Sequence, residues 1–178
     1  MKASCTGIAL SISMDNVYLP LHHSVGTNLN VEDVRRYLGK WLASSSPKVT
    51  YEGKFVRHVL ANEGLYLEAP MHDVTLMSYV IEAHMKHEIE NLSARWLKID
   101  ILSDEDVKGK GSKAITSAGV DLNTAADFTV QRSRVVRQLF EQMQQRLEKD
   151  RNLQCIYEKI ELPTQNVLFL MERNGVLI

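Results

Sequence analysis

The feature that most constrains the fold of this chain is a change in the spacing of its apolar residues. Near the N-terminus, Ile8, Leu10 and Ile12 alternate with small or polar residues, which is the two-residue period of a β-strand. Between residues 122 and 149, apolar side chains recur mostly every four positions, which predicts one long amphipathic helix. Because both periods are present, the sequence predicts a mixed α/β fold.

The first strand is expected to return as the second strand of a hairpin. Asp15-Asn16 has the chemistry of a turn, and residues 17–19 have the composition of the returning strand. Asn30 is a predicted N-cap for a helix that ends near Ala43. The other predicted elements are a short strand at 48–50, helices at 53–62, 73–83 and 88–97, an interruption at Asn152 and Leu153, and a last helix from about Ile156 to Asn174.

Composition excludes several classes of protein. The chain has 178 residues and a formal net charge of −1, which argues against a basic nucleic-acid-wrapping protein and against an acidic tail protein. This length is typical of one domain, so we expect residues 1–178 to form a single domain. No apolar run approaches the roughly 20 residues of a membrane helix, and the N-terminus has no secretory signal. The two cysteines, Cys5 and Cys155, fit neither a disulfide framework nor a metal site, so we expect a cytoplasmic protein without a membrane partner.

Five segments in order along the chain carry a family resemblance. Residues 48–64 resemble the second exonuclease motif of bacterial DNA polymerase I, whose pattern is K-x-G-x-N-x-K-Y-D-x-x-x-L-x-x-x-G. The other matching segments are 73–79, which resembles the family's D-T-M-L-x-S-Y, 86–97, which resembles R-H-D-M-D-S-L-A-E-R-W-L, the G-K-G loop at 109–111, and the runs 157–163 and 171–176, which resemble the stretch that leads into the polymerase domain.

This resemblance implies a ribonuclease-H-like α/β fold and a 3′→5′ exonuclease activity that removes mismatched nucleotides from a growing DNA strand. Members of the family use two divalent ions, Mg²⁺ or Mn²⁺, about 4 Å apart; one generates hydroxide and the other stabilises the leaving oxygen. Such hard ions require clustered carboxylates. The family supplies these carboxylates from D-x-E in a first motif, the aspartate of the second motif and Y-x-x-x-D in a third.

The same resemblance predicts that this copy has lost its metal site. In the second motif the family asparagine falls on Glu52 and the metal-binding aspartate on Val56, which has no lone pair for a cation. An ungapped alignment onward from the G-K-G loop places the tyrosine of the third motif at Phe128 and its aspartate at Arg132, a permanent positive charge. The first motif is expected on a strand upstream of residue 7, which this chain begins too late to contain. We therefore expect an N-terminally truncated and catalytically inactive exonuclease-like domain, without bound metal, from a longer polymerase.

Two alternative interpretations remain open. Residues 125–129 also resemble the family's A-E-D-A-D-V-T, and in that register Asp127 is a retained acid. An active metal-dependent exonuclease would then use unmatched acids such as Asp73, Asp121 and Asp127, although an N-cap role explains Asp73 better. The second alternative is a free-standing protein-interaction domain that is unrelated to replication.

Basic residues near the predicted cleft favour contact with primer or template DNA without cleavage. The same residues would otherwise form a solvated loop and ion pairs with the acidic region at 81–106. The polymerase domain of the parent chain is the expected protein partner, and sheet edges left open by the missing first strand predict a tendency to form a homodimer. The predicted DNA-binding residues are Lys108, Lys110 and Lys113 in the glycine-rich loop and Arg132 and Arg134 in the long helix.

Overall fold

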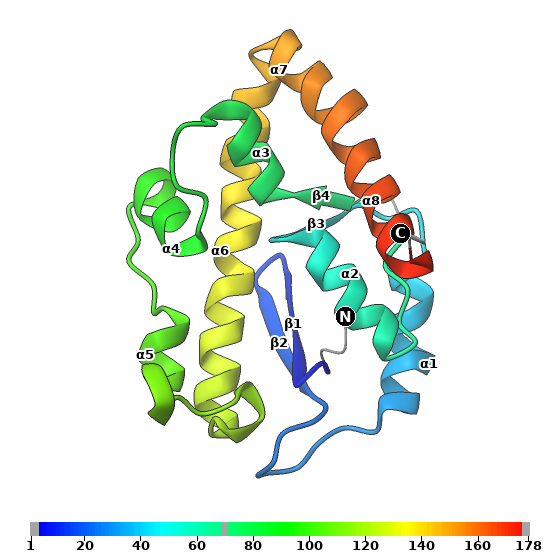
Figure 1. The fold of residues 1–178 in the computed structure, drawn as a ribbon, viewed down its shortest axis with the longest axis vertical. Helices are drawn as coiled ribbons and strands as arrows, with labels where there is room; N and C mark the ends of the chain where they lie inside the picture. The colour runs from blue at the N-terminus through cyan, green and yellow to red at the C-terminus, as the bar shows by residue number, and fades with distance from the viewer. Residues whose placement is uncertain (1–3, 69–70, 176–178) are drawn as a thin grey trace.

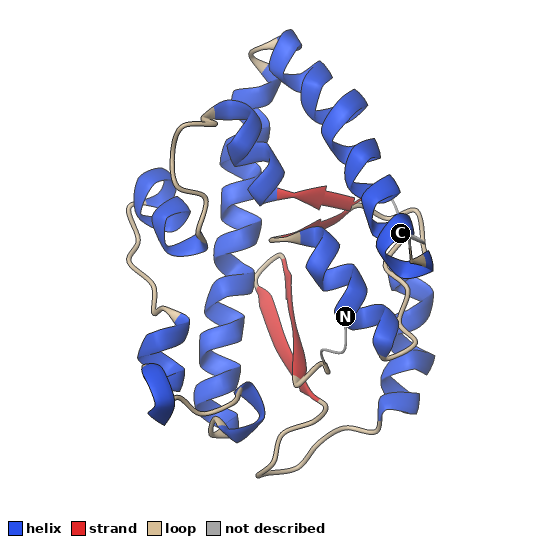
Figure 2. Cartoon of the chain, in the orientation of Figure 1, coloured by secondary structure: helices blue, strands red, loops and turns tan. Residues whose placement is uncertain are grey.

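The computed structural model describes residues 4–68 and 71–175. Its longest element is α6 (Leu122–Glu148), which runs along the molecule beside both pairs of strands (Figure 1). The strands lie between α6 and a second group of helices, so helices flank the small sheets on two sides (Figure 2). The mixed α/β class predicted from the sequence is confirmed.

The N-terminal hairpin forms as predicted, but its turn lies two residues earlier. β1 (Gly7–Ile12) pairs with β2 (Asp15–Pro20) in antiparallel register. The turn is therefore Ser13-Met14, and the prediction of a turn at Asp15-Asn16 is wrong. Its first residue has a φ of 53°, a positive value of the kind that tight hairpin turns use, and its second is 90% exposed. This register is favoured because a slip by one residue would turn Ile8 away from the apolar cluster on which it packs.

The second pair of strands is parallel, and the sequence predicts only one of its members. β3 (Lys48–Thr50) is the expected short strand, and β4 (Met71–Asp73) pairs with it. A strand of three residues shows no readable period, so β4 could not be predicted from the spacing of apolar residues. α2 (Gly53–Asn62) lies between the two strands along the chain, since parallel strands need a crossover. Within the described residues, the pairs β1–β2 and β3–β4 remain two separate sheets.

Side-chain caps start several of the predicted helices. Asn30 accepts a hydrogen bond from the N–H of Glu32 at 2.8 Å, which confirms its predicted role. A reciprocal capping box between Ser103 and Asp106 begins a short helix in the acidic turn. The capped helices are α1 (Val31–Leu42), α3 (Val74–Ile81) and α5 (Asp104–Lys108). Between them, α4 (Ile89–Leu92) and its π-helical continuation (Ser93–Leu97) begin without a side-chain cap.

The chain after α6 forms one continuous helical arm. The predicted interruption at Asn152 and Leu153 is wrong, because both residues lie in the first turn of α7. Their N–H groups donate to the carboxylate of Asp150, so the break falls just before α7, where an N-cap satisfies amides that have no partner inside the helix. The arm consists of α7 (Arg151–Ile156), a π-helical turn (Tyr157–Glu161) and α8 (Leu162–Asn174).

Two apolar clusters hold these elements together. The larger cluster joins α6 to α3 and α4, and its centre is formed by Met77, Leu92, Leu139 and Met143, each at most 1% exposed. The smaller cluster joins the hairpin to α1 and α2. Burial of these side chains is the main favourable contribution to folding. In the described part of the chain, the helices lack the length and apolar character needed to cross a membrane.

Candidate functional site

The second exonuclease motif falls at the start of α2. Glu52 precedes the helix in the left-handed conformation, with a φ of 53°. Gly53 donates its N–H to Asp73 Oδ2 at 2.6 Å, and a Cβ at this glycine would lie 2.6 Å from Thr50 Oγ1. These contacts fix the start of α2 against β3 and β4, and therefore fix where the side chain of Val56 lies one turn later.

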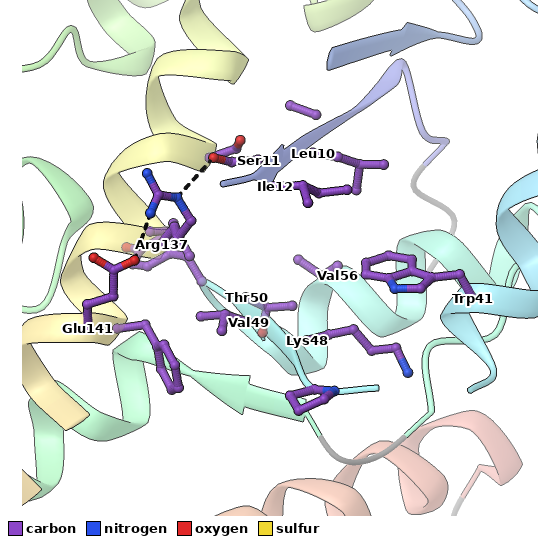
Figure 3. A pocket seen from close by; sticks show the side chains of 16 residues that line it. Leu10, Ser11, Ile12, Trp41, Lys48, Val49, Thr50, Val56, Arg137 and Glu141 are labelled. Carbon is purple, nitrogen blue, oxygen red and sulfur yellow. Dashed lines mark hydrogen bonds and ion pairs between the residues drawn. The ribbon is translucent and has the colours of Figure 1, made fainter. Parts of the chain in front are cut away.

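Val56, which the resemblance aligns with the family's metal-binding aspartate, lies in an apolar environment. It packs against the cluster formed by the hairpin, α1 and α2. It also lines a groove between β1 and β3, beside Leu10 and Trp41 (Figure 3). The valine therefore supplies van der Waals contact at this position and offers no ligand to a cation.

Arg132 and Phe128, which the ungapped register aligns with the third motif, contact each other. The guanidinium carbon of Arg132 lies 4.4 Å from the centre of the Phe128 ring, which is a cation–π arrangement. The guanidinium also forms an ion pair with Glu90 and donates to the backbone oxygen of Leu102 at 3.2 Å. With 19% of its side chain exposed, Arg132 links α6 to α4 and to the segment before α5. A permanent cation thus occupies the predicted aspartate position.

The charge of Arg132 also acts on the start of α2. Burial raises the pKa of Glu52, Asp73 raises it further, and Arg132 partly opposes both effects. Burial, reinforced by Glu52, raises the pKa of Tyr51 to about 12. The guanidinium of Arg132 therefore acts on both Glu52 and Phe128. Val56 instead shares its groove with other α6 residues, including Ser133 and Arg137.

The unmatched acids lie in separate parts of the fold. Asp73 is 1% exposed, and its carboxylate accepts hydrogen bonds from the N–H of Gly53, from the N–H of Thr75 and from Gln165 Nε2 at 2.6 Å. Its predicted N-cap role is confirmed. Asp121 caps the first turn of α6, and Asp127 is exposed on that helix. In the described ranges, no group of three His, Cys, Asp or Glu side chains is placed to hold a metal ion.

Ion pairs within the chain occupy three of the five predicted DNA-binding residues. Lys108 pairs with Asp104 at 3.2 Å and Lys110 with Glu105 at 2.8 Å, so acids of α5 neutralise much of the glycine-rich loop. Arg132 pairs with Glu90 as described. Lys113 and Arg134 are exposed on the loop and on α6. Binding of DNA by these five residues stays a prediction.

Sequence reasoning missed Glu90 as the specific partner of Arg132. The two residues are separated by 42 positions, and their pairing depends on how α4 packs on α6. The only signal was the general expectation that the basic residues pair with the acidic region. His87, a family position outside the metal site, contacts Ser78 Oγ through Nδ1 at 2.8 Å and has a structural role between α3 and α4.

Comparison with known proteins identifies relatives that match most of the chain. The chain is 29% identical to DNA polymerase I of Pseudomonas aeruginosa over 185 aligned residues, which cover 99% of this chain and 20% of that protein. It is 31% identical to DNA polymerase I of Synechocystis over 163 residues, which cover 90% of this chain and 16% of that protein. The chain thus spans about a fifth of the length of these relatives.

Solved structures give the same fold. A structure described as the POL domain of Pol1 from M. smegmatis in complex with DNA primer-template and dNTP superposes with a TM-score of 0.73 and 22% identity, covering 97% of this chain and 26% of that one. Brucella melitensis NrnC superposes with a TM-score of 0.62 and 17% identity, covering 93% of this chain and 75% of that one. The model of the family "DNA polymerase I, ribonuclease H-like domain" matches residues 1–139. The chain belongs to this family, and its fold is that of a ribonuclease-H-like exonuclease domain.

Proposed function

We propose that this chain is a catalytically inactive 3′→5′ exonuclease-like domain that serves as a scaffold beside the polymerase domain of a DNA polymerase I, in the replication and repair of bacterial DNA in the cytoplasm. The observation that carries the proposal is the chemistry at two positions of the former metal site. Val56 packs in an apolar cluster, and the guanidinium of Arg132 is engaged by Glu90, Leu102 and Phe128. Family membership supplies the context, since related chains are parts of longer DNA polymerases.

The residues at these positions do not fit a pair of divalent metal ions. Mg²⁺ and Mn²⁺ bind oxygen ligands, and a valine offers none. A guanidinium carries a positive charge at every accessible pH and would repel a dication. The carboxylates nearby are engaged differently: Asp73 is enclosed by three donors, and Glu90 is paired with Arg132. We therefore derive no metal-dependent step for this chain.

The helical arm supports the scaffold role. Its inner face is bound to α2, where Lys54 pairs with Glu172 at 2.7 Å and Arg173 donates to Asn62 at 2.8 Å. The arm lies beyond residue 139, where the match to the exonuclease family ends, whereas the match to the Pseudomonas polymerase covers 99% of the chain. The arm also exposes apolar side chains, and in our proposal these pack on the polymerase domain. They are Ile156, Ile160, Val167, Leu168, Leu170 and Met171.

A nuclease assay tests the proposal directly. The purified chain is incubated with a fluorescently labelled mismatched primer-template and Mg²⁺ or Mn²⁺, and product lengths are measured on a denaturing gel. We expect no shortening of the primer, with or without EDTA. A proofreading polymerase assayed in parallel provides the positive control.

Two variants identify the source of any observed cleavage. Asp121→Asn and Asp127→Asn alter exposed acids of α6, so we expect both variants to remain folded. If the chain shortens the primer, if EDTA stops the reaction and if either variant loses it, the inactive reading is overturned in favour of an exonuclease that uses unmatched acids. Cleavage that persists in EDTA and in both variants identifies a contaminating nuclease, and the assay is then repeated on repurified protein.

A further inference from the structure

A pocket lies where the helical arm meets α2 and β4, and we call it the arm pocket. It has a volume of about 320 Å³, which is within the range of small-molecule sites. Arg57 of α2 and Met71 and His72 of β4 line it together with residues of the π-helical turn and α8. α8 contacts both α2 and β4 (Figure 1). The arm pocket shares no lining residue with the groove beside Val56, so the two are separate features of the fold.

Arg57 supplies the positive charge of the arm pocket. Its guanidinium carbon lies 3.8 Å from the centre of the Phe169 ring, and its Nη1 donates to Asn166 Oδ1 at 2.8 Å. These two contacts from α8 hold the guanidinium in one orientation. A guanidinium has five N–H donors, and stacking on a ring covers its face but leaves its edge free to donate. Arg57 is therefore prepared to bind a planar anion such as a carboxylate.

The charge of Arg57 has no close opposite charge among the described residues. The hydrogen bond to Asn166 is the only one that its side chain makes there, and it forms no ion pair. Burial lowers the pKa of Arg57, and Glu68 partly opposes this shift. Partial removal of a cation from water has a cost that a bound anion would offset.

His72 adds a neutral donor to the same pocket. Asp73 donates its N–H to Tyr157 Oη at 3.1 Å, and this oxygen lies 3.3 Å from His72 Nδ1. The Tyr157 hydroxyl therefore donates to Nδ1, which places the hydrogen of the neutral imidazole on Nε2. Burial lowers the pKa of His72, and Glu158 partly opposes this shift, so the imidazole is neutral at about pH 7. In the described part of the chain Nε2 has no hydrogen-bond partner, so its N–H is free to donate to a ligand.

The rest of the wall limits the charge and the character of the ligand. Glu158 also lines the arm pocket, and its carboxylate accepts a hydrogen bond from Gln154 Nε2 at 2.9 Å. One guanidinium together with one carboxylate favours a ligand with a single negative charge over a doubly charged phosphate. An apolar ligand body is favoured by the apolar residues of the wall, since their contact with it removes apolar surface from water. These residues are Leu67, Met71, Leu162 and Pro163.

The arm side of the pocket is held in place by the Asp73 network. Gln165 lines the pocket and donates to Asp73 Oδ2 at 2.6 Å. Tyr157, 2% exposed, lies in the π-helical turn that also carries Glu158. Turns of this kind are frequent at functional sites. Because buried hydrogen bonds fix these positions before a ligand arrives, little conformational entropy is lost on binding.

We propose that the arm pocket binds a small monocarboxylate with an aromatic or branched aliphatic body. The carboxylate accepts hydrogen bonds from the free edge of the Arg57 guanidinium and from His72 Nε2, and the apolar body packs on Leu162 and Pro163. Because the pocket joins α2 and β4 to α8, the bound ligand stabilises the attachment of the helical arm. The inference is independent of whether the chain cleaves DNA.

A titration followed by NMR tests this inference. The probes are 3-phenylpropionate and 4-methylpentanoate, and the control is 3-phenylpropanamide, which has the shape of the first probe without its charge. We expect saturable binding of a carboxylate probe with a dissociation constant of about 1 mM or lower, and shifts of amide signals in α2, β4 and α8. The amide should bind at least about tenfold more weakly, because it forms no charge-assisted hydrogen bond with Arg57.

Three variants locate the binding site. Arg57→Gln removes the guanidinium, and Asn166→Asp places a carboxylate of the chain beside it. We expect each change to weaken binding of the carboxylate probes at least about tenfold, the first by loss of the cation and the second by internal competition for it. Arg36→Gln changes an exposed arginine of α1 outside the pocket and should leave binding unchanged. Urea unfolding checks each variant, and Asn166→Asp keeps the contact between Arg57 and Phe169 if Arg57→Gln loosens the arm.

Four outcomes would overturn the proposal. The first is the absence of saturable binding by either carboxylate. Equal affinity for 3-phenylpropanamide would mean that apolar contact alone causes binding. Shifts confined to other elements would place the probe elsewhere, and unchanged affinity in folded Arg57→Gln and Asn166→Asp would exclude the guanidinium as the carboxylate receptor. Binding that requires the carboxylate and is lost in both variants but kept in Arg36→Gln supports the proposal.

Discussion

Two charged groups in this molecule, the buried Asp73 and the partly buried Arg132, are stabilised in different ways. Asp73 joins β4 to α3, and its carboxylate accepts hydrogen bonds from two backbone N–H groups and one side-chain amide. Arg132 lies on α6 and combines an ion pair with Glu90, a backbone oxygen and an aromatic ring. The carboxylate of Asp73 is thus stabilised by neutral hydrogen-bond donors, whereas the guanidinium of Arg132 is stabilised mainly by the opposite charge of Glu90.

Within our proposal, this difference explains how the domain keeps its fold with a valine and an arginine at the positions that the resemblance assigns to metal ligands. A charge shielded from water is tolerated when it is hydrogen-bonded or paired with an opposite charge. The Asp73 carboxylate meets the first condition, and the Arg132 guanidinium meets the second, although its Nε has no hydrogen-bond partner among the described residues. The Asp73 network ties β4, α2 and α8 together without any metal ion. The Arg132 network ties α6 to α4 at the position where the resemblance predicts a metal-binding aspartate. Within our proposal, the second network replaces cohesion that a metal site would provide.

The largest expected effect comes from removing the Asp73 carboxylate. Asp73→Ala leaves the N–H groups of Gly53 and Thr75 and the amide of Gln165 without an acceptor, and it removes an N-cap. We expect the free energy of unfolding to fall by about 3 to 5 kcal/mol, measured by urea denaturation. Asp73→Asn keeps one acceptor oxygen and should lose less. Equal, small losses in both variants would contradict a central role for this network.

A smaller loss is expected when the Arg132 network is broken. Arg132→Met keeps most of the apolar stem but removes the ion pair, and we expect a loss of about 1 to 2 kcal/mol in urea unfolding. A double-mutant cycle with Glu90→Gln should show coupling of about 1 kcal/mol. The matched control is Arg134→Met, an exposed change on the same helix that should stay within about 0.5 kcal/mol of the parent. Additive effects of the Arg132 and Glu90 changes would mean that their pairing is energetically unimportant.

Alkaline pH should lower the free energy of unfolding through one tyrosine near each of the two charged groups. Burial raises the pKa of Tyr51, near Arg132, from 10.0 to about 12, and it raises the pKa of Tyr157, beside Asp73. Because the folded state disfavours the phenolate, this stability is complete below pH 10.0 and is lost as the pH rises toward the folded-state value. Urea unfolding at a series of pH values should show this decline. Tyr51→Phe should reduce it and Tyr37→Phe, at an exposed tyrosine, should not; the opposite pattern would refute the assignment.

The smallest expected effect concerns DNA binding by Lys113 and Arg134, the two predicted DNA-binding residues that form no ion pair with the described residues. We expect binding of a primer-template, measured by fluorescence anisotropy, to be weak and to depend on salt. The double change Lys113→Glu and Arg134→Glu should weaken it and reduce the salt slope by about 2. Lys110→Glu provides the control, since Glu105 already pairs with that lysine. If only the control weakens binding, the interface lies elsewhere.

The predictable parts of the fold are those with a local physical signal. The spacing of apolar residues correctly predicts the hairpin and α6, and the caps Asn30 and Asp73 correctly predict two helix starts. The failures have a common cause. The turn at Ser13-Met14 follows from strand register, and β4 follows from pairing with β3, so neither could be read from local composition.

The amino-acid sequence by itself determined which chemistry is absent at Val56 and Arg132, because a valine side chain has no lone pair and a guanidinium keeps its charge in any fold. Only the tertiary structure decided how the chain accommodates these residues. It placed Glu90 against Arg132, enclosed Asp73 with donors from three elements and formed a pocket between β4 and the helical arm. The physical reason is that the chemistry of a side chain is a local property, whereas contacts between distant residues depend on how whole elements pack.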